Sequence, residues 1–197
     1  MPDLALFDFD NTITVNDNYT PFIHFSVPKY RIIAGVVLLA PFIAAYKIGA
    51  LPATKMRTMV TMLGMRGRSE GDVRQLGLDY GTKHLPGVLR PEALERITWH
   101  QGRGDTVVVV SASLDVYLAR WCENVGVDLI CTMLEVRDGK LTGRYLGGDC
   151  TCHEKARRVR ERYDLNAYGT IYAYGDSKED EAMLALANKR FFQWKEC

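Results

Sequence analysis

Residues 4–10 read LALFDFD, and this stretch decides the class of fold. Its first four residues are continuously apolar, which predicts a strand covered on both faces rather than a half-exposed strand of alternating polarity. Two carboxylates, Asp8 and Asp10, follow at once. Ligands of open α/β sheets gather where parallel strands end, so this pair predicts a site at the carboxyl edge of such a sheet.

Two further apolar runs, at 106–110 and 171–174, have the same continuous character. Helical patterns alternate with them. The first, at 91–102, begins on proline, and the others cover about 153–163 and about 179–186. Strands that alternate with helices in this way predict a doubly wound α/β fold with a parallel sheet.

The composition excludes several classes of protein. The 197 residues are 47% hydrophobic and 25% charged, which is too apolar for a disordered chain and fits one domain with a modest insertion. With 25 Lys+Arg against 24 Asp+Glu, the formal net charge of +1 gives no general attraction to nucleic acid. We therefore expect no nucleic-acid partner.

The cysteines and the N-terminal residues predict a cytoplasmic location. Five cysteines form an odd, scattered set without the spacing of a disulfide framework, which is typical of a reducing compartment. The residues after Met1 are acidic and strand-like, with no basic and apolar leader. We expect a cytoplasmic protein, with peripheral attachment to the inner face of the membrane as an option.

The interval 15–84 departs from the strand–helix alternation. Its central run, 32–46, holds fifteen uncharged residues around Pro41. As a helix this run would reach about 22 Å at about 1.5 Å per residue, against a hydrocarbon core of about 30 Å. The run therefore predicts a proline-broken helical segment that is too short to cross a bilayer alone.

The same interval is strongly basic. No acidic residue stands between Asp17 and Glu70, whereas seven cations do: Lys29, Arg31, Lys47, Lys55, Arg57, Arg66 and Arg68. Apolar surface with unbalanced cations is typical of an element on anionic lipid, so residues 29–68 are a predicted site of peripheral membrane contact. The alternative is that the apolar run packs on itself or on a second subunit, as in a homodimer.

A second acidic cluster lies near the other end of the chain. Gly175 follows the third apolar run, and Asp176 and Asp180 then stand about one helical turn apart. Four carboxylates at neighbouring strand ends would repel one another unless a cation joined them. Oxygen donors of this kind, together with phosphate, are the ligands that Mg²⁺ prefers. The two acidic pairs therefore predict a Mg²⁺ site.

The remaining candidate residues suit a phosphate group. Ser111 and Ala112 follow the second apolar run, where a hydroxyl and free backbone N–H groups could hold phosphate oxygens. Lys155, in the helical pattern at 153–163, could balance phosphate charge as a point cation. The order of these elements along the chain indicates phosphate chemistry more strongly than any one of them.

These elements resemble the motifs of the haloacid dehalogenase (HAD) superfamily. The resemblance rests on LFDFDNT at 6–12, VSAS at 110–113, Lys155, and YGDSKED at 174–180, which stand in the family's order across nearly the whole chain. The long insertion after the first motif is similar to the branch that includes phosphoserine phosphatase. The resemblance implies a Rossmann-like catalytic core with a helical cap inserted after the first strand.

That branch implies a division of the chain. The catalytic core would comprise residues 1–14 and 85–197, and the helical cap residues 15–84. The apolar and basic cap is similar in composition to phosphatidylglycerophosphatase C, a lipid-phosphate phosphatase of the same branch. Where phosphoserine phosphatases of the branch carry a cap glutamate, this chain offers only Asp17, which has a shorter reach.

The resemblance also implies roles for the carboxylates. Asp8 would be the nucleophile that attacks phosphorus and becomes an aspartyl phosphate. Asp10 would be the general acid and then the general base. Mg²⁺ would bind the Asp8 carboxylate, the Asp10 backbone carbonyl and Asp176, with Asp180 supporting the metal site.

The phosphate-binding set completes this assignment: Thr12, Ser111, Ala112 and Lys155. The predicted function is a Mg²⁺-dependent phosphomonoesterase for a small phosphorylated substrate, either a soluble ester or a lipid head group. Three alternatives are open: a phosphotransferase of the same fold, a phospho-accepting receiver domain, and a non-catalytic phosphate-binding or scaffold protein. Receiver domains have no large insertion after the first strand, so residues 15–84 argue against that alternative.

Overall fold

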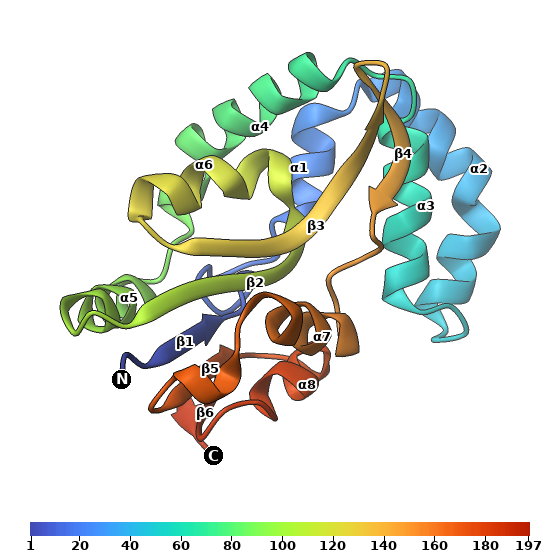
Figure 1. The fold of residues 1–197 in the computed structure, drawn as a ribbon. Coiled ribbons are helices and arrows are strands. Elements are labelled where there is room, and N and C mark those ends of the chain that lie inside the picture. Colours follow the sequence, from blue (N-terminus) through green and yellow to red (C-terminus); the bar gives the residue numbers. More distant parts are fainter.

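The computed structural model describes residues 1–197 and places seven strands in one sheet. They are β1 (Leu4–Phe7), β2 (Thr106–Leu114), β3 (Asp128–Arg137), β4 (Lys140–Leu146), β5 (Ile171–Gly175), β6 (Lys189–Phe192) and β7 (Lys195–Glu196). Their order across the sheet is β4-β3-β2-β1-β5-β6-β7, which makes β1 central (Figure 1). The inner five strands are parallel, and the edge strands β4 and β7 are antiparallel to their neighbours.

The three apolar runs form the centre of this sheet, as predicted. β1 pairs in parallel with β2 and β5, so that Leu4 stands opposite Thr106 on one side and Ile171 on the other. Every residue of β1 is buried. A strand covered on both faces needs apolar side chains at every position, which explains the continuous runs. The predicted α/β fold with a parallel sheet is confirmed.

Eight α-helices accompany the sheet. They are α1 (Tyr19–Ser26), α2 (Lys29–Lys47), α3 (Ala53–Met65), α4 (Glu70–Lys83), α5 (Pro91–Gly102), α6 (Asp115–Val125), α7 (His153–Arg162) and α8 (Glu181–Leu184). Side chains of the central strands alternate between two apolar clusters. Phe7 packs in the cluster that contains Ile97 of α5, and Leu6 in the cluster that contains Val159 of α7. Helices therefore cover both faces of the sheet.

The predicted helices are confirmed in two cases and corrected in one. Helices α5 and α7 match their predicted ranges to within a residue. The prediction for 179–186 was wrong in extent, because α8 is only four residues long and a 3₁₀ turn, Lys178–Asp180, precedes it. Ser177 and Asp180 cap that turn reciprocally, and this local hydrogen bonding replaces the first turn of the expected helix.

Helix α2 also differs from the prediction. It spans 19 residues, because the charged residues at both ends continue the helix beyond the uncharged run, and Pro41 lies inside it without ending it. By length and composition α2 could cross a membrane, and no other helix of the chain could; its mean hydropathy is 1.5. The expectation of a broken helix too short to span was therefore wrong. Only 6% of the apolar stretch within α2 is buried in the protein.

Strand β2 runs further than predicted. The sequence predicted that it ends at 110, but it continues to Leu114, so Ser111 lies within the strand and not at its end. The pairing with β3 shifts register between Ser111 and Leu114. At this irregularity Ser113 N donates to Ser111 Oγ at 3.0 Å, so a side chain supplies a hydrogen bond that a regular ladder would take from the neighbouring strand.

The helices of the interval 15–84 share the core of the sheet. Phe22 of α1 and Tyr80 of α4 belong to the same apolar cluster as the central strands. α4 lies so close to α6 that a Cβ at Gly77 would stand 2.0 Å from the carbonyl oxygen of Val116. Helices α2 and α3 are outermost: α3 lies beside β4, and α2 packs against α3 on the side away from β4 (Figure 1).

Candidate active site

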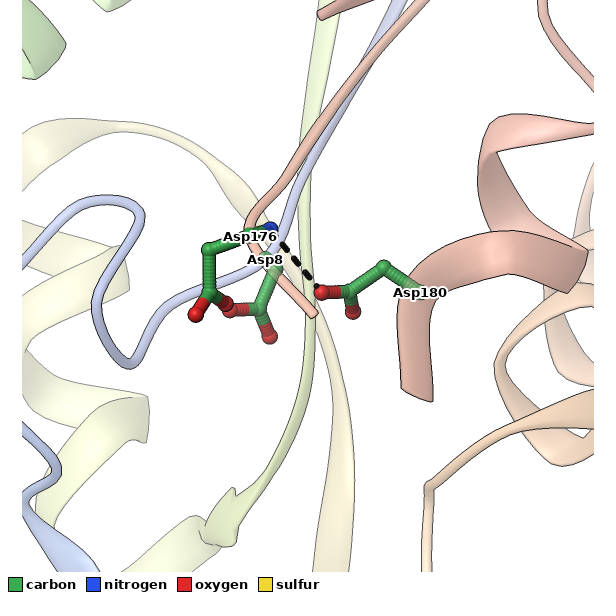
Figure 2. Close-up of side chains that lie close together, drawn as sticks. All are labelled: Asp8, Asp176 and Asp180. Atoms are coloured by element: carbon green, nitrogen blue, oxygen red, sulfur yellow. Dashed lines mark hydrogen bonds between the residues drawn. The ribbon is translucent and has the colours of Figure 1, made fainter. Parts of the chain in front are cut away.

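Three carboxylates meet at the carboxyl edge of the central strands (Figure 2). Asp8 directly follows β1, Asp176 directly follows β5, and Asp180 lies in the 3₁₀ turn beyond it. Oxygens of the three lie within 4.8 Å of one another. The Asp8 backbone N–H donates to Tyr174 O at 2.9 Å, which ties the end of β1 to β5. The parallel pairing of β1 and β5 thus joins acidic residues from opposite ends of the chain.

Lys155 of α7 reaches into this group as a buried cation. Its Nζ donates to Asp8 Oδ1 at 2.5 Å and to Asp180 Oδ1 at 2.6 Å, and its side chain is 2% exposed. Burial lowers the pKa of Lys155, but the attraction of the two carboxylates exceeds that effect, so the pKa is raised. Lys155 is therefore a permanent positive charge beside Asp8.

The acidic groups outnumber this cation. Burial raises the pKa of Asp8 well above its usual range; Lys155 opposes the rise, and Asp180 and Asp10 add to it. Burial and then Asp180 raise the pKa of Asp176 to about 6. This excess of negative charge is what a divalent cation at the site would neutralise.

Three donors orient Asp10. Its Oδ1 accepts from the backbone N–H and from the side-chain amide of Asn18, both at 2.9 Å. Its Oδ2 accepts from Ser113 Oγ, and the Tyr117 hydroxyl donates to that same Oγ at 2.6 Å. Burial raises the pKa of Asp10, although these hydrogen bonds lower it. A raised pKa suits a carboxyl group that must carry a proton near neutral pH.

The predicted phosphate-binding residues have free hydrogen-bonding capacity. Thr12 is buried, and its hydroxyl has no hydrogen-bond partner. Ser111 Oγ accepts from Ser113 N, but its own hydroxyl hydrogen has no acceptor in the chain. Ala112 lies between Ser111 and Ser113 on β2 and is half-buried. A buried hydroxyl without a partner is unfavourable, so the Thr12 hydroxyl indicates a position that a ligand oxygen would satisfy.

Asp180 and Asp176 are held in different ways. Both oxygens of Asp180 are occupied: Oδ1 accepts from Lys155, and Oδ2 accepts from the backbone N–H groups of Asp176 and Ser177, each at 3.1 Å. The Asp176 carboxylate accepts no hydrogen bond from another residue. Asp176 therefore offers free oxygens to a cation, whereas Asp180 maintains the shape of the loop. The available oxygens of Asp8 and Asp176 fit a hard cation such as Mg²⁺.

Alanine substitutions are expected to separate these two roles. Asp176→Ala should weaken Mg²⁺ activation by about tenfold or more with little loss of stability. Asp180→Ala removes several buried hydrogen bonds and a partner of Lys155, so the free energy of unfolding should fall by about 2 kcal/mol or more. Mg²⁺ titration of activity and urea unfolding measure the two effects. A greater loss of stability in Asp176→Ala than in Asp180→Ala would contradict the assignment.

Arg57 of α3 joins the outer helices to the acidic loop. Its Nη2 lies 3.2 Å from Asp149 Oδ2 and 3.3 Å from Glu179 Oε2. Glu179 also accepts from Thr151 Oγ1 and lies in the same 3₁₀ turn as Asp180. Sequence patterns placed Arg57 only among seven basic residues, because nothing in its spacing connects it to two acids that follow much later in the chain.

Asn18, Ser113 and Tyr117 were not predicted as site residues. Ser113 had a signal, because it stands two residues after Ser111 and so on the same side of β2. Asn18 donates to Asp10 from the start of α1, whereas Tyr117 of α6 reaches Asp10 through Ser113. No sequence pattern connects either residue to Asp10, and only the packing of those helices reveals these contacts.

Comparison with known proteins identifies the family. Residues 5–185 match the family described as haloacid dehalogenase-like hydrolase, and the chain belongs to that family. The chain is a phosphatase-type hydrolase of the family, as the sequence predicted.

Two curated relatives match over nearly the whole chain. Protein CicA of Caulobacter vibrioides is 30% identical over 199 residues, which cover 98% of this chain and 86% of that protein. A histidinol-phosphatase of Neisseria meningitidis is 27% identical over 203 residues, which cover 96% of this chain and 89% of the relative.

Solved structures share the fold. A Bordetella pertussis protein of unknown function matches with a TM-score of 0.77 and 21% identity, covering 98% of this chain and 90% of that one. A substrate-bound phosphoserine phosphatase matches with a TM-score of 0.66 and 20% identity, covering 98% and 86%. At these identities the similarity concerns the fold alone.

Proposed function

We propose that the chain is a Mg²⁺-dependent phosphomonoesterase that works through an aspartyl phosphate on Asp8. The observation that supports this most strongly is the buried Asp8–Lys155 pair beside the free carboxylate of Asp176. A second carboxyl group, Asp10, is held by three hydrogen-bond donors. A nucleophile, a fixed cation and a general acid are the groups that phosphoryl transfer to a side chain requires.

In the first half-reaction Asp8 is the nucleophile. Its carboxylate oxygen forms a bond to phosphorus while the ester P–O bond breaks, and Asp10 gives its proton to the departing oxygen. Lys155 holds Asp8 in position and balances charge on the phosphoryl oxygens, to which Thr12 and Ser111 donate hydrogen bonds. The alcohol leaves, and the phosphoryl group stays on Asp8.

In the second half-reaction Asp10 is the general base. Now ionised, it takes a proton from a water molecule, whose oxygen forms a bond to phosphorus as the bond to the Asp8 oxygen breaks. Phosphate is released and Asp8 is again a carboxylate. Asn18 and Ser113 keep the Asp10 carboxyl group in one orientation for both steps, which is the contribution of their hydrogen bonds.

The acidic residues fit the proposed ion. Asp8 and Asp176 would hold Mg²⁺ together with the Asp10 backbone carbonyl, and Asp180 would support them. The ion's chemistry when bound is to neutralise charge on the phosphoryl oxygens. The support for this placement is the free carboxylate of Asp176 and the raised pKa of Asp8 and Asp176, which a nearby cation would lower.

A soluble aryl phosphate and Mg²⁺ test this proposal. Activity should vanish in excess chelator and return with Mg²⁺. Below a pH of about 6 Asp176 gains a proton in the metal-free protein, so the Mg²⁺ affinity should be about tenfold weaker at pH 5 than at pH 7. Mg²⁺ titrations of the initial rate at both pH values measure this shift. Full activity in excess chelator, at either pH, would contradict the metal site.

The proposed substrate is a small phosphate ester or a lipid head-group phosphate. The similarity to a histidinol-phosphatase favours a soluble ester. A cavity of about 390 Å³ lies between α1, α2 and α3, and most of its lining side chains are apolar, which favours a substrate with an apolar part. Arg57, which is paired with Glu179 of the acidic loop, also lines this cavity. Turnover of histidinol phosphate, phosphoserine, sugar phosphates, nucleotides and phosphatidylglycerophosphate in one panel distinguishes the two classes.

A phosphotransferase is the second candidate function. An aspartyl phosphate on Asp8 could pass its phosphoryl group to an alcohol instead of water, and the oriented Asp10 would serve either acceptor. Adding a candidate alcohol to the assay and following its phosphorylated product distinguishes the two activities. A non-catalytic phosphate-binding role would give no turnover of any ester in the panel.

We propose that residues 15–84 act as a cap on a catalytic core formed by 1–14 and 85–197. The shared apolar cluster supports a cap that is anchored through α1 and α4, with α2 and α3 outermost. The proposed location is the cytoplasm, in keeping with five free cysteines, and residues 29–68 are the proposed region of peripheral membrane contact. A homodimer through α2 is the alternative use of that surface.

A further inference from the structure

Helix α2 presents an apolar surface that nothing in the chain covers. Leu39 is its one buried residue, whereas Ile33, Val37 and Leu38 are 65%, 70% and 63% exposed. Large contiguous apolar patches are rare on monomeric proteins and mark interaction sites. The outer face of α2 is therefore a candidate contact surface.

Both ends of α2 carry residues suited to a lipid interface. Lys29 and Tyr30 begin the helix, and Tyr46 and Lys47 end it. Tyrosine and lysine place an apolar body against lipid while their polar tips stay at the level of the head groups. The apolar face thus lies between two polar ends, as in a helix that rests along a membrane surface.

A cluster of unpaired arginines lies next to α2. Arg66 at the end of α3 lines a cavity with Arg137 and Arg144 of the β3–β4 hairpin. None of the three guanidinium groups is paired with a carboxylate. The one acidic residue that lines this arginine pocket, Glu135, accepts a hydrogen bond from Thr142 Oγ1 at 2.6 Å. The arginine pocket therefore carries a net positive charge.

The arginine pocket adjoins the N-terminal end of α2. Arg31 of α2 donates to the backbone carbonyl of Arg66 at 2.8 Å. Nearby, burial and then Arg31 lower the pKa of Arg68, and Asp72 only partly opposes them. Cations are thus crowded together where the apolar face begins, and they come from both the cap and the β3–β4 hairpin.

We infer that the outer face of α2 and the arginine pocket together dock on an anionic phospholipid bilayer, with head-group phosphates in the arginine pocket. Charge favours this occupant over a second copy of the chain, because a two-fold contact would bring the same unpaired cations together. Docking does not require a lipid substrate. The inference makes the proposed membrane contact of residues 29–68 specific and extends it to the β3–β4 hairpin. It does not depend on the proposed catalysis, because vesicle binding can be measured whether or not the protein turns over any ester.

Docking on the surface fits the structure better than insertion across it. α3 follows α2 and packs beside it, so a span by α2 would have to carry α3 through the bilayer as well. Arg57 of α3 is held by Asp149 and Glu179 next to the acidic loop, which ties that helix to the catalytic core. The outer helices are therefore placed to lie on a membrane.

Co-sedimentation of the full chain with vesicles tests this inference. The wild type should bind vesicles of mixed phosphatidylglycerol and phosphatidylcholine at low salt and leave them at high salt, with far weaker binding to phosphatidylcholine alone. Each basic residue near an anionic surface raises the vesicle partition coefficient about fivefold. The double variant Arg137→Glu with Arg144→Glu should therefore lower the partition coefficient by more than about tenfold. Ile33→Ser with Val37→Ser should also reduce it, through lost apolar contact.

A matched variant controls for net charge. Arg160→Glu with Lys195→Glu changes the charge equally at two exposed, unpaired cations on α7 and β7, and it should keep most of the binding. Soluble aryl phosphate turnover should be unchanged in all three variants, which shows that each is folded. If the charge-reversed double variant fails to fold, the milder Arg137→Gln with Arg144→Gln replaces it in the vesicle assay.

Three results would overturn the inference: no binding of the wild type to anionic vesicles at low salt, an equal loss in the control variant, or equal binding to neutral vesicles. A dimer that separates when Ile33 and Val37 are changed, with no vesicle binding, would assign the surface to a second copy of the chain instead.

Discussion

Asp8→Asn is expected to reduce phosphate-ester turnover by at least about 10⁴-fold, because an amide oxygen is a poor nucleophile toward phosphorus. The variant should fold normally, since the amide oxygen can still accept the hydrogen bond from Lys155. Steady-state turnover of an aryl phosphate and thermal unfolding measure the two properties. Activity within about tenfold of the wild type would remove Asp8 from the nucleophilic role.

Asp138→Asn is the matched control for this substitution. Asp138 is exposed in the turn between β3 and β4, at a φ of 51° that asparagine also adopts, and its carboxylate forms no ion pair. Removing its charge leaves the acidic cluster and Lys155 intact, so turnover should change by less than about threefold. An equal loss in both variants would mean that the effect of Asp8→Asn arises from general loss of charge.

Lys155→Met is expected to have the second largest effect. It removes the buried cation between Asp8 and Asp180, so two buried carboxylates then face each other without a counter-charge. Breaking a buried pair in this way lowers the free energy of unfolding by about 3–5 kcal/mol. The pKa of Asp8, already raised, should rise further, which leaves less of the ionised nucleophile, and we expect turnover to fall by at least about 10³-fold.

Arg160→Met controls for the loss of a cation on the same helix. Arg160 is exposed on α7 and forms no ion pair, so its replacement should change stability by less than about 0.5 kcal/mol. Urea unfolding and aryl phosphate turnover of the two variants give the comparison. Turnover of Lys155→Met near the wild-type value would show that the reaction does not depend on this ammonium group.

Much of the core of the fold could be predicted because parallel strands buried on both faces leave a strong signal. The runs at 4–7, 106–110 and 171–174 are apolar at every position, and they became the three adjacent central strands. The acidic residues that follow β1 and β5 were therefore expected to meet, and oxygens of Asp8 and Asp176 do lie close together. The position of these residues follows from topology alone.

The antiparallel edge of the sheet was missed. Strands β3 and β4 are mixed in polarity, because β4 is at the edge of the sheet and part of each strand is exposed. The sequence did carry a turn signal, since Asp138 and Gly139 both have positive φ, of 51° and 70°. An Asp-Gly pair is a strong hairpin signal, and it would have predicted this hairpin and so placed Arg137 beside the turn.

The residues that orient the site could not be predicted in the same way. Asn18 and Tyr117 contact the Asp10 network from helices whose packing depends on the whole core. Arg57 meets Asp149 and Glu179 only because α3 lies over the end of β4 and the acidic loop. Such contacts follow from tertiary packing, which short sequence patterns do not encode.

The most direct test of the central claim is to locate the phosphoryl group on the protein during turnover. With an aryl phosphate, whose leaving group needs no protonation, Asp10→Asn should form the aspartyl phosphate but hydrolyse it slowly. Acid quenching followed by peptide mass spectrometry should then find one phosphoryl group on the peptide that carries Asp8. This phosphoryl group should be removed by hydroxylamine, and it should be absent from the double variant Asp8→Asn with Asp10→Asn. A phosphoryl group on another residue, or none during turnover, would contradict the account.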